Sequence, residues 1–437
     1  MSNIIKKIFK KKTTEREENF MYSNKEGYGG IMYQNDHTRL VHDSCSICYN
    51  KLRDRTYDER VAYISDKIKV GHESITEHSN VITKFTLTKE LYPELAELLT
   101  TARYLNSKIV EKDNKVHVLL GGSIRGYKHI IRTIENPNNK VYSILKESLY
   151  ELPYCYFTDM IKDGIFEKRL FNIVDNQLEI TMKGEEIVTQ KRFNGKIIRK
   201  DKFDIVGMDN IAKILELVNN HEEIFTINDI LDMVTITVLF KGVSRTASHQ
   251  LVRHRAGITQ LSQRYVNMKD ANFLSPEEFK PEKYNKDDIY EIKLFAEVDG
   301  KETIVRIPLK LKEIGNMEIS IYNQLIEQGL LKEDARSFLP SNVETSLYMT
   351  FTFRNFIKFL ELRTGKGAQA EIKELANELE EIFIEEQSKN LGEDIYQYLL
   401  PAYTRIQMEL ESMGEDQIDE VVGEIEEITI PMEDKNV

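Results

Sequence analysis

Basic residues gather in one short stretch of the chain. Residues 250–265 read QLVRHRAGITQLSQRY and contain no acidic residue. They place four basic side chains and a serine around an uncharged, glycine-containing loop: Arg253, His254, Arg255, Arg264 and Ser262. The arginine guanidinium is a rigid planar fork that binds phosphate in a bidentate manner. Two interpretations stand side by side, since these arginines either bind an anionic ligand or pair with carboxylates elsewhere in this acidic chain.

Composition limits the class of protein. The chain has 437 residues, 41% of them hydrophobic, which is enough for a buried core and suggests two to three domain-sized units. The net charge of −12 disfavours a general surface for nucleic acid or an anionic membrane. No stretch approaches the roughly 20 apolar residues of a membrane span, and no secretory signal opens the sequence. We therefore expect a cytoplasmic protein that binds neither nucleic acid nor a membrane.

The charged ends and the cysteines carry little functional signal. A basic segment over residues 1–38 and an acidic one over 406–437 are expected to be solvated tails. The three cysteines are too few for a disulfide framework. Cys45 and Cys48 lack a second CxxC or a histidine pair at zinc-finger spacing, so we expect no metal site.

The basic stretch needs strands and helices to position it. Apolar residues at helical spacing predict a helix over 57–70. Alternating apolar and polar residues predict a strand over 81–87, and VTITVLF predicts a second strand over 234–240. A helix opened near Gly242 and Ser244 should follow it. Strand, helix and loop in this order are a common way to present ligand-binding groups.

Material of mixed character lies between the two strands. We interpret residues 79–234 as a folded insertion, with a helix near 91–105 and a strand over 116–120, and expect it to form a flap or an extra interface layer beside the site. Within it, GGSIRGYKHIIR around Arg125 loosely echoes the later FTFRNFIKFLELR. One such match is weak evidence for a repeat, so we treat it as coincidence. Farther on, the sequence predicts a hairpin over 290–309.

Four blocks of sequence together resemble one family. The stretch 250–265 is similar to a signature of Arg-His-Arg, a short spacer, Ser, and then Arg-Tyr two residues later. GHESITEH at 71–78 resembles an upstream GHxSxxEH segment, whereas EDARSFLP at 333–340 and FIKFLELR with GAQAEI at 356–372 resemble the downstream half. The blocks follow the order found in the flavin-dependent thymidylate synthases.

The resemblance implies an architecture. It is an α+β fold with a central, mainly antiparallel sheet flanked by helices, built from residues 39–78 and 235–405 around the inserted region 79–234. The family assembles as a homotetramer whose active sites lie at subunit interfaces and combine several chains.

The resemblance also implies roles for the residues at matching positions. Six side chains would contact FAD: Ser74, Glu77, Arg253, His254, Arg255 and Arg354. The dUMP site would be formed by seven: Gln250, Arg253, Gln260, Ser262, Arg264, Arg336 and Arg363. His72 would lie where the folate and flavin rings meet, and no metal ion is implied.

The implied chemistry suits these residue types. A phosphate dianion on dUMP and a pyrophosphate on FAD both need arginines and exclusion of water. Attack on the uracil ring moves negative charge onto it, and an arginine poised there stabilises the transition state more than the ground state. Arg363 is the candidate catalytic residue. The implied reaction is reductive methylation of dUMP to dTMP, in which NADPH reduces FAD and methylenetetrahydrofolate donates one carbon.

The sequence departs from the family pattern in four places. Six residues separate Arg255 from Ser262, one fewer than usual, and Gln260 stands where many members have glutamate. Gly367 stands where some have a flavin-contacting histidine, and Thr352 where asparagine is common. Two alternatives therefore stay open. One is a flavin and folate enzyme that modifies another pyrimidine deoxynucleotide, for example by hydroxymethylation, and the other is a catalytically inactive homologue that acts as a binding module.

Three residues allow other interpretations. Ser262 lacks the GxSxG turn of a serine nucleophile, and a phosphate-binding hydroxyl needs no activation. His72, taken alone, is equally an ordinary polar residue before a strand. Cys155 in LPYCYF faintly resembles the nucleophile loop of the unrelated cysteine-dependent thymidylate synthase, but the histidine after the cysteine is missing. We expect Cys155 to be a small buried apolar residue.

Overall fold

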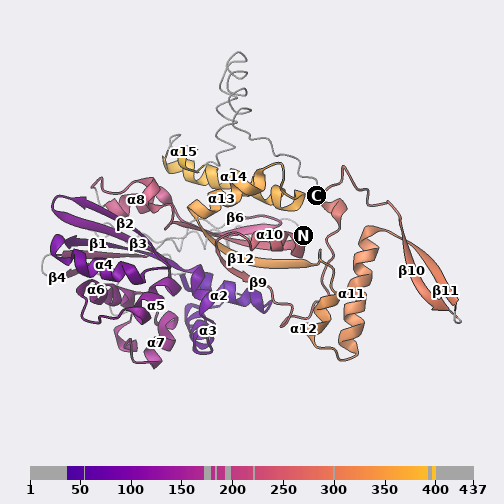
Figure 1. Ribbon diagram of the computed structural model, residues 1–437, viewed down its shortest axis with the longest axis horizontal. Helices are drawn as coiled ribbons and strands as arrows, with labels where there is room; N and C mark the ends of the chain where they lie inside the picture. The colour runs from indigo at the N-terminus through magenta and orange to yellow at the C-terminus, as the bar shows by residue number, and fades with distance from the viewer. Residues whose placement is uncertain are drawn as a thin grey trace, which may run out of the picture.

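The computed structural model shows two five-stranded sheets with helices packed on them (Figure 1). It describes residues 37–399, apart from residue 54 and the segments 172–178, 183–184, 192–197, 220–221, 299–300 and 392–395. The expected acidic tail and nearly all of the expected basic tail lie outside the described residues. All strand pairs among the described residues are antiparallel, so the expected α+β class is confirmed.

The first sheet has the strand order β2-β3-β1-β5-β4. Its strands are β1 (Asn80–Thr88), β2 (Asn106–Lys112), β3 (Lys115–Ser123), β4 (Glu179–Met182) and β5 (Glu185–Lys191). The helices of this part of the chain are α2 (His37–Cys48), α3 (Tyr57–Lys69), η1 (Glu73–His78), η2 (Lys89–Leu91), α4 (Tyr92–Thr101), α5 (Ile124–Thr133), α6 (Lys140–Ser148), η3 (Leu149–Glu151), η4 (Tyr154–Phe157), α7 (Thr158–Lys162) and η5 (Lys168–Leu170). Apolar residues of β1 and β3 share one buried core with α3, α4, α5 and α6.

The second sheet has the strand order β6-β7-β8-β12-β9. Its strands are β6 (Ile198–Arg199), β7 (Phe203–Met208), β8 (Thr235–Ser244), β9 (Gly257–Gln260) and β12 (Glu344–Thr352). The helices around it are α8 (Ile211–Asn219), α9 (Ile227–Ile230), α10 (Arg245–Leu251), α13 (Phe353–Thr364), α14 (Ala370–Leu391) and α15 (Tyr396–Leu399). Helices α13 and α14 cover one face, and α2 packs on the other through Leu40 and Ile47 (Figure 1).

A long excursion between β9 and β12 extends away from both sheets (Figure 1). It contains η6 (Pro276–Glu278), β10 (Tyr290–Val298), β11 (Lys301–Leu309), α11 (Leu311–Glu327), α12 (Lys332–Ala335) and η7 (Arg336–Phe338). Strands β10 and β11 pair only with each other among the described residues, which confirms the hairpin expected over 290–309.

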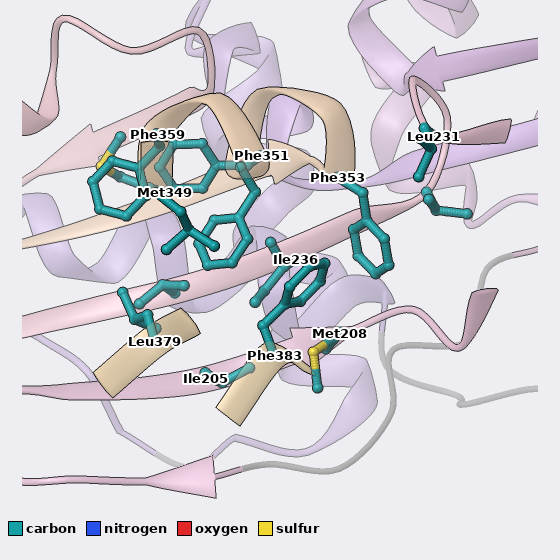
Figure 2. Close-up of a cluster of buried hydrophobic side chains, with 14 of the residues drawn as sticks. Ile205, Met208, Leu231, Ile236, Met349, Phe351, Phe353, Phe359, Leu379 and Phe383 are labelled. Carbon is teal, nitrogen blue, oxygen red and sulfur yellow. The ribbon is translucent and has the colours of Figure 1, made fainter. Parts of the chain in front are cut away.

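Aromatic side chains dominate the core of the second sheet. Phe351 of β12 lies 5.5 Å from Phe359 of α13, and Phe353 lies 4.9 Å from Phe383 of α14, between ring centroids. Figure 2 shows these rings between the sheet and the two helices. Edge-to-face and offset ring pairs of this kind add to the burial of apolar area, so they fix α13 and its polar residues against the sheet.

The two cores divide the chain at a different place from the expected insertion of 79–234. Buried residues of β7 and α8, such as Phe203 and Ile211, belong to the core of the second sheet. Residues 198–234 therefore pack with the part expected to be catalytic. We define residues 79–191, whose described parts include the first sheet, as the inserted unit.

The two similar stretches of sequence, around Arg125 and around Arg354, lie at equivalent places in the two sheets. Ser123, at the end of β3, pairs with Asn80 at the start of β1. Thr352, at the end of β12, likewise pairs with Thr235 at the start of β8. The hydroxyls of both end residues cap the following helix, α5 or α13, by accepting a backbone N–H at 3.3 Å.

The neighbouring strands repeat this arrangement. β2 begins where Asn106 pairs with Gly121, two residues before the cap of α5. β9 begins where Gly257 pairs with Thr350, two residues before the cap of α13. The orders β2-β3-β1-β5-β4 and β9-β12-β8-β7-β6 therefore correspond strand for strand. The echo marks a structural repeat, which corrects the expectation of coincidence.

Most of the expected elements are confirmed within a few residues. The helix expected over 57–70 is α3, the strand over 81–87 is β1, and the strand over 234–240 is β8. Ser244 caps α10 by accepting the backbone N–H of Ala247 at 2.9 Å. Within the part of the chain that the structure describes, no helix has both the length and the apolar character needed to cross a membrane.

Candidate functional site

A buried histidine fixes the GHESITEH segment to the second sheet. His78 is 1% exposed, and its two ring nitrogens each lie 2.9 Å from a hydroxyl oxygen, Nδ1 from Thr350 and Nε2 from Thr259. Burial lowers the pKa of His78 to about 3. The imidazole is therefore neutral near pH 7, donating to one hydroxyl and accepting from the other. His78 anchors the segment to β12 and β9.

Glu77 lies where this segment meets β9. A Cβ placed on Gly257 would come within 3.0 Å of the Glu77 carbonyl oxygen, so the close approach depends on a glycine. The Glu77 carboxylate pairs with Arg125 of the inserted unit, with side chains 31% and 51% exposed. His72 and Ser74 are exposed on the same segment. All three residues expected here are thus accessible to a ligand.

The Arg-His-Arg loop joins α10 to β9. Arg253 and Arg255 are exposed and form no ion pair with another described residue. His254 lies edge-on to Phe359, with ring centroids 5.0 Å apart, and its Nε2 accepts a hydrogen bond from Arg363 Nε at 2.9 Å. Burial, followed by the charge of Arg363, lowers the pKa of His254 to about 4. The loop therefore offers two uncompensated cations around a neutral imidazole.

Arg363, in the last turn of α13, is held in place by α10. Besides His254, its guanidinium donates to the Gln250 side-chain oxygen at 3.1 Å and to the Gln250 carbonyl at 3.3 Å. The Gln250 amide in turn donates to Gln369. Burial, followed by the charge of Arg253, lowers the pKa of Arg363. The candidate catalytic arginine is thus oriented before any ligand arrives.

Ser262, Arg264 and Arg336 come together around Glu333. The Ser262 hydroxyl accepts the backbone N–H of Arg264 at 3.3 Å. Arg264 Nε lies 3.3 Å from the Glu333 carboxylate, and Arg336 Nε donates to the Glu333 carbonyl at 3.1 Å. The Arg264 and Glu333 side chains are 53% and 47% exposed, and such pairs contribute only ~0–1 kcal/mol. A bound anion can therefore replace Glu333 as the partner of Arg264.

A further arginine joins this group and was missed from the sequence. Arg245 opens α10 directly after the Ser244 cap, and burial, followed by the charge of Arg336, lowers its pKa. It forms no ion pair with another described residue. Two neighbouring arginines without a shared carboxylate favour an anion between them. The Ser-Arg pair at the end of a strand was the available signal in the sequence.

Gln260 lies at the end of β9, and its amide donates to the Ser248 hydroxyl of α10 at 2.9 Å. The short spacer before Ser262 is mostly strand β9, which leaves little free loop. Thr352, where asparagine is common in the family, is the cap of α13. A Cβ on Gly367, where some family members have a histidine, would have no atom within 4 Å. No other described side chain takes the place of that histidine next to Gly367.

Arg354 is held by the segment that precedes β8. Its Nε lies 2.7 Å from the Asp232 carboxylate, and a terminal nitrogen donates to the Asn228 carbonyl at 3.0 Å. No hydrogen bond or ion pair connects it with the described residues of the Arg-His-Arg loop. A contact between Arg354 and FAD is implied by the resemblance alone.

The cysteines carry no sign of chemistry. Cys155 is fully buried, and burial raises the pKa of its thiol to about 12, so a thiolate nucleophile is disfavoured. Burial, with Cys45 beside it, raises the pKa of Cys48 to about 11. Across the described ranges, no group of three or more His, Cys, Asp or Glu side chains is arranged to hold a metal ion.

Comparisons with known proteins agree with the motifs. The family model described as thymidylate synthase complementing protein matches residues 190–387. A flavin-dependent thymidylate synthase of Pyrococcus furiosus is 34% identical over 181 residues, which cover 40% of this chain and 64% of that protein. Another, of Pyrococcus abyssi, is 35% identical over 159 residues, which cover 35% of this chain and 56% of that protein. Residues 190–387 of this chain are therefore similar to the flavin-dependent thymidylate synthases.

The flavin-dependent thymidylate synthase match covers only part of the molecule. The chain spans less than two thirds of the length of the curated relatives named above. The family model begins at residue 190, so it leaves out the GHESITEH segment and nearly all of the inserted unit. A crystal structure of ThyX from Helicobacter pylori complexed with FAD and dUMP aligns with 22% identity and a TM-score of 0.27, covering 40% of this chain and 81% of that one. A likeness this low carries no argument about the site.

Proposed function

We propose that the chain catalyses the reductive methylation of dUMP to dTMP, with FAD as cofactor and with NADPH and methylenetetrahydrofolate as co-substrates. The match of residues 190–387 to the family model supports the type of reaction. The observation that carries the proposal is the gathering of three arginines from distant segments: Arg264 pairs with the Glu333 carboxylate, Arg336 donates to the Glu333 carbonyl, and Arg245 lies close enough to Arg336 for its charge to act on it. This excess of positive charge suits a nucleotide phosphate.

The residues present fit a flavin nucleotide. Arg253 and Arg255 are exposed and lack ion-pair partners among the described residues, so they are free to bind the pyrophosphate of FAD. His254, held neutral beside them, offers a ring N–H for a further hydrogen bond. Ser74 and Glu77 would complete the flavin site, and His72 would lie at its junction with the folate. Bound FAD supplies hydride transfer, which no side chain can perform.

The dUMP site would combine the two arginine groups. Ser262, Arg264 and Arg336, together with Arg245, would hold the phosphate, and Gln250, Gln260 and Arg253 would line the site. Arg363 would face the uracil ring. Because its guanidinium is already oriented by Gln250 and His254, it can stabilise charge that develops on the ring without reorganising. Loss of such a donor typically costs ~3 kcal/mol of transition-state stabilisation.

We further propose a homotetramer with active sites at subunit interfaces, acting on small molecules in the cytoplasm. The carried-over roles involve several chains, whereas Ser262, Arg264 and Arg336 already meet within one. Neighbouring chains would then supply the remaining contacts to flavin and folate.

One experiment on the purified full-length protein tests the proposed function. We expect a flavin absorbance spectrum and, after addition of NADPH and methylenetetrahydrofolate, release of deuterium from the ring carbon of labelled dUMP that receives the methyl group. Product analysis with dUMP and with dCMP identifies the pyrimidine. Turnover of dCMP alone, or a hydroxymethylated product, would favour the related enzyme. A colourless protein that takes up no FAD would favour the binding module.

A further inference from the structure

In each half of the structural repeat, the residues just before the first strand, β1 or β8, contact the other half. The carbonyl oxygen of Glu77, three residues before β1, approaches Gly257 at the start of β9. The carbonyl oxygen of Asp232, three residues before β8, accepts a hydrogen bond from the Asn106 side chain at the start of β2, at 2.8 Å. We call these contacts the Glu77 junction and the Asp232 junction. In a two-fold symmetric dimer, each subunit makes the same contact with the other. The two halves of this single chain contact each other in the same reciprocal way.

An arginine at the same position in each half holds the carboxylate of the junction. Arg125 stands two residues after the cap of α5 and pairs with Glu77. Arg354 stands two residues after the cap of α13 and pairs with Asp232 at 2.7 Å. The two ion pairs are therefore structural counterparts. Arg125 belongs to the Glu77 junction, and Arg354 belongs to the Asp232 junction.

Only the Glu77 junction carries the basic loop. The three residues at 253–255 precede β9 by one residue and read Arg-His-Arg. Their counterparts at 102–104 precede β2 by one residue and read Ala-Arg-Tyr. Tyr104 is 68% exposed and packs edge-on against His129, with ring centroids 4.7 Å apart. The Asp232 junction thus resembles the Glu77 junction in geometry but lacks the two arginines that have no carboxylate partner among the described residues.

We propose that Arg125 of the inserted unit, and not Arg354, is the positioning residue of the flavin site. This inference rests on the proposed function, because it assigns the Arg-His-Arg loop to FAD. A carboxylate beside an incoming pyrophosphate repels it unless a cation holds and neutralises that carboxylate. Arg125 does this for Glu77. Its side chain is 51% exposed, so its positive charge is also accessible to a bound anion.

The inserted unit thereby gains a defined function. It contacts the GHESITEH segment at a second carboxylate, because Arg132 of α5 also pairs with Glu73 at 2.6 Å. The fully buried Lys128 lies 3.6 Å from the same carboxylate. Helix α5 therefore holds the segment at both Glu73 and Glu77. A flavin site formed on this segment depends on residues that the family match does not include.

Matched substitutions at the two equivalent positions test the inference. FAD is titrated into apoprotein and its dissociation constant is measured by quenching of flavin fluorescence, with thermal unfolding of the same samples. We expect Arg125→Ala to weaken FAD binding on the order of tenfold, a loss reduced from that of a buried pair because the side chains are partly exposed. Arg354→Ala should change the dissociation constant for FAD less than about twofold. It should lower the stability of the protein about as much as Arg125→Ala does, since each substitution breaks one partly exposed ion pair.

Further variants separate positioning from general stability. Arg125→Lys keeps the charge and should restore part of the affinity. In a Glu77→Gln background, Arg125→Ala should have little further effect, because the carboxylate it holds is already neutral. Arg169→Ala removes a surface ion pair of the inserted unit and serves as the neutral control.

The possible results are distinguishable. Equal losses of FAD affinity in Arg125→Ala and Arg354→Ala, or a loss in Arg354→Ala alone, would overturn the inference. So would unchanged affinity in a folded Arg125→Ala protein. A wild-type protein that binds no FAD would instead contradict the proposed function.

Discussion

The buried His78 makes a quantitative prediction about pH. Its pKa is about 3 in the folded protein and 6.5 in an unfolded chain. A depressed pKa means that the stabilisation is complete above pH 6.5 and is lost as the pH falls from 6.5 toward 3. The difference between these two pKa values lowers the free energy of unfolding by about 2 kcal/mol between pH 7 and pH 5. Acid should therefore release the GHESITEH segment from β9 and β12.

His78→Gln is the matched variant, because its amide can still donate to one threonine and accept from the other but does not titrate. Hydrogen exchange measured at β9 and β12 reports the local opening free energy, which suits a chain with two cores that need not unfold in one step. We expect wild type to lose about 2 kcal/mol more than His78→Gln between pH 7 and pH 5. Other titrating groups are present in both proteins and cancel. Equal pH dependence in the two proteins would refute the reasoning.

Three other changes should have distinct effects. Arg264→Ala and Arg336→Ala should each raise the KM for dUMP on the order of tenfold or more with a smaller change in kcat, since each removes a charge-assisted contact to phosphate. Arg363→Gln should lower kcat about a hundredfold and raise the pKa of His254, measured by NMR, because the neighbouring cation is removed. Gly315→Ala should destabilise the excursion by ~1–3 kcal/mol in thermal unfolding, because its Cβ would lie 2.1 Å from the Phe273 ring.

Controls for these changes lie elsewhere in the chain. Arg306→Ala removes an exposed arginine of the hairpin and should leave the KM for dUMP unchanged. Gly367→Ala adds a methyl group to open space and should leave stability nearly unchanged. An unchanged KM in both phosphate variants would remove the phosphate assignment, and an unchanged pKa of His254 would show that Arg363 does not lie against it. A fully stable Gly315→Ala protein would mean that Phe273 moves away at no cost.

Local patterns in the sequence predicted much of the fold. Helix α3, strands β1 and β8 and the β10–β11 hairpin follow from periodicity and turn residues, which depend on neighbours in the chain. The arginine contacts could be predicted only from the order of the four motifs. Local patterns do not reveal them, because Arg264 and Glu333 are distant in the sequence.

Other features depend on long-range pairing that local patterns do not encode. Strand β9 is four residues long and has no strand-like alternation, and it forms because β12 offers a free edge. The placement of β7 in the second sheet was not predicted, because its buried apolar residues look like those of any core strand. The structural repeat was missed because equivalent positions such as Ser123 and Thr352 share a capping role rather than an identical residue.

The pairing of Arg125 with Glu77 shows the same limit. The echo in sequence pointed to Arg125, but its partner was set by the register of β1 against β3, which places the end of β3 beside the start of β1. Two arginines in loosely similar stretches of sequence therefore belong to different junctions. Only the three-dimensional arrangement separates Arg125 from Arg354.

The most direct test of the central claim is deuterium release from ring-labelled dUMP by the purified protein with bound FAD, NADPH and methylenetetrahydrofolate. We predict that wild type releases the label and forms dTMP, and that Arg363→Gln retains FAD but releases the label about a hundredfold more slowly. A wild-type protein that carries flavin yet neither releases the label nor forms dTMP would contradict the account.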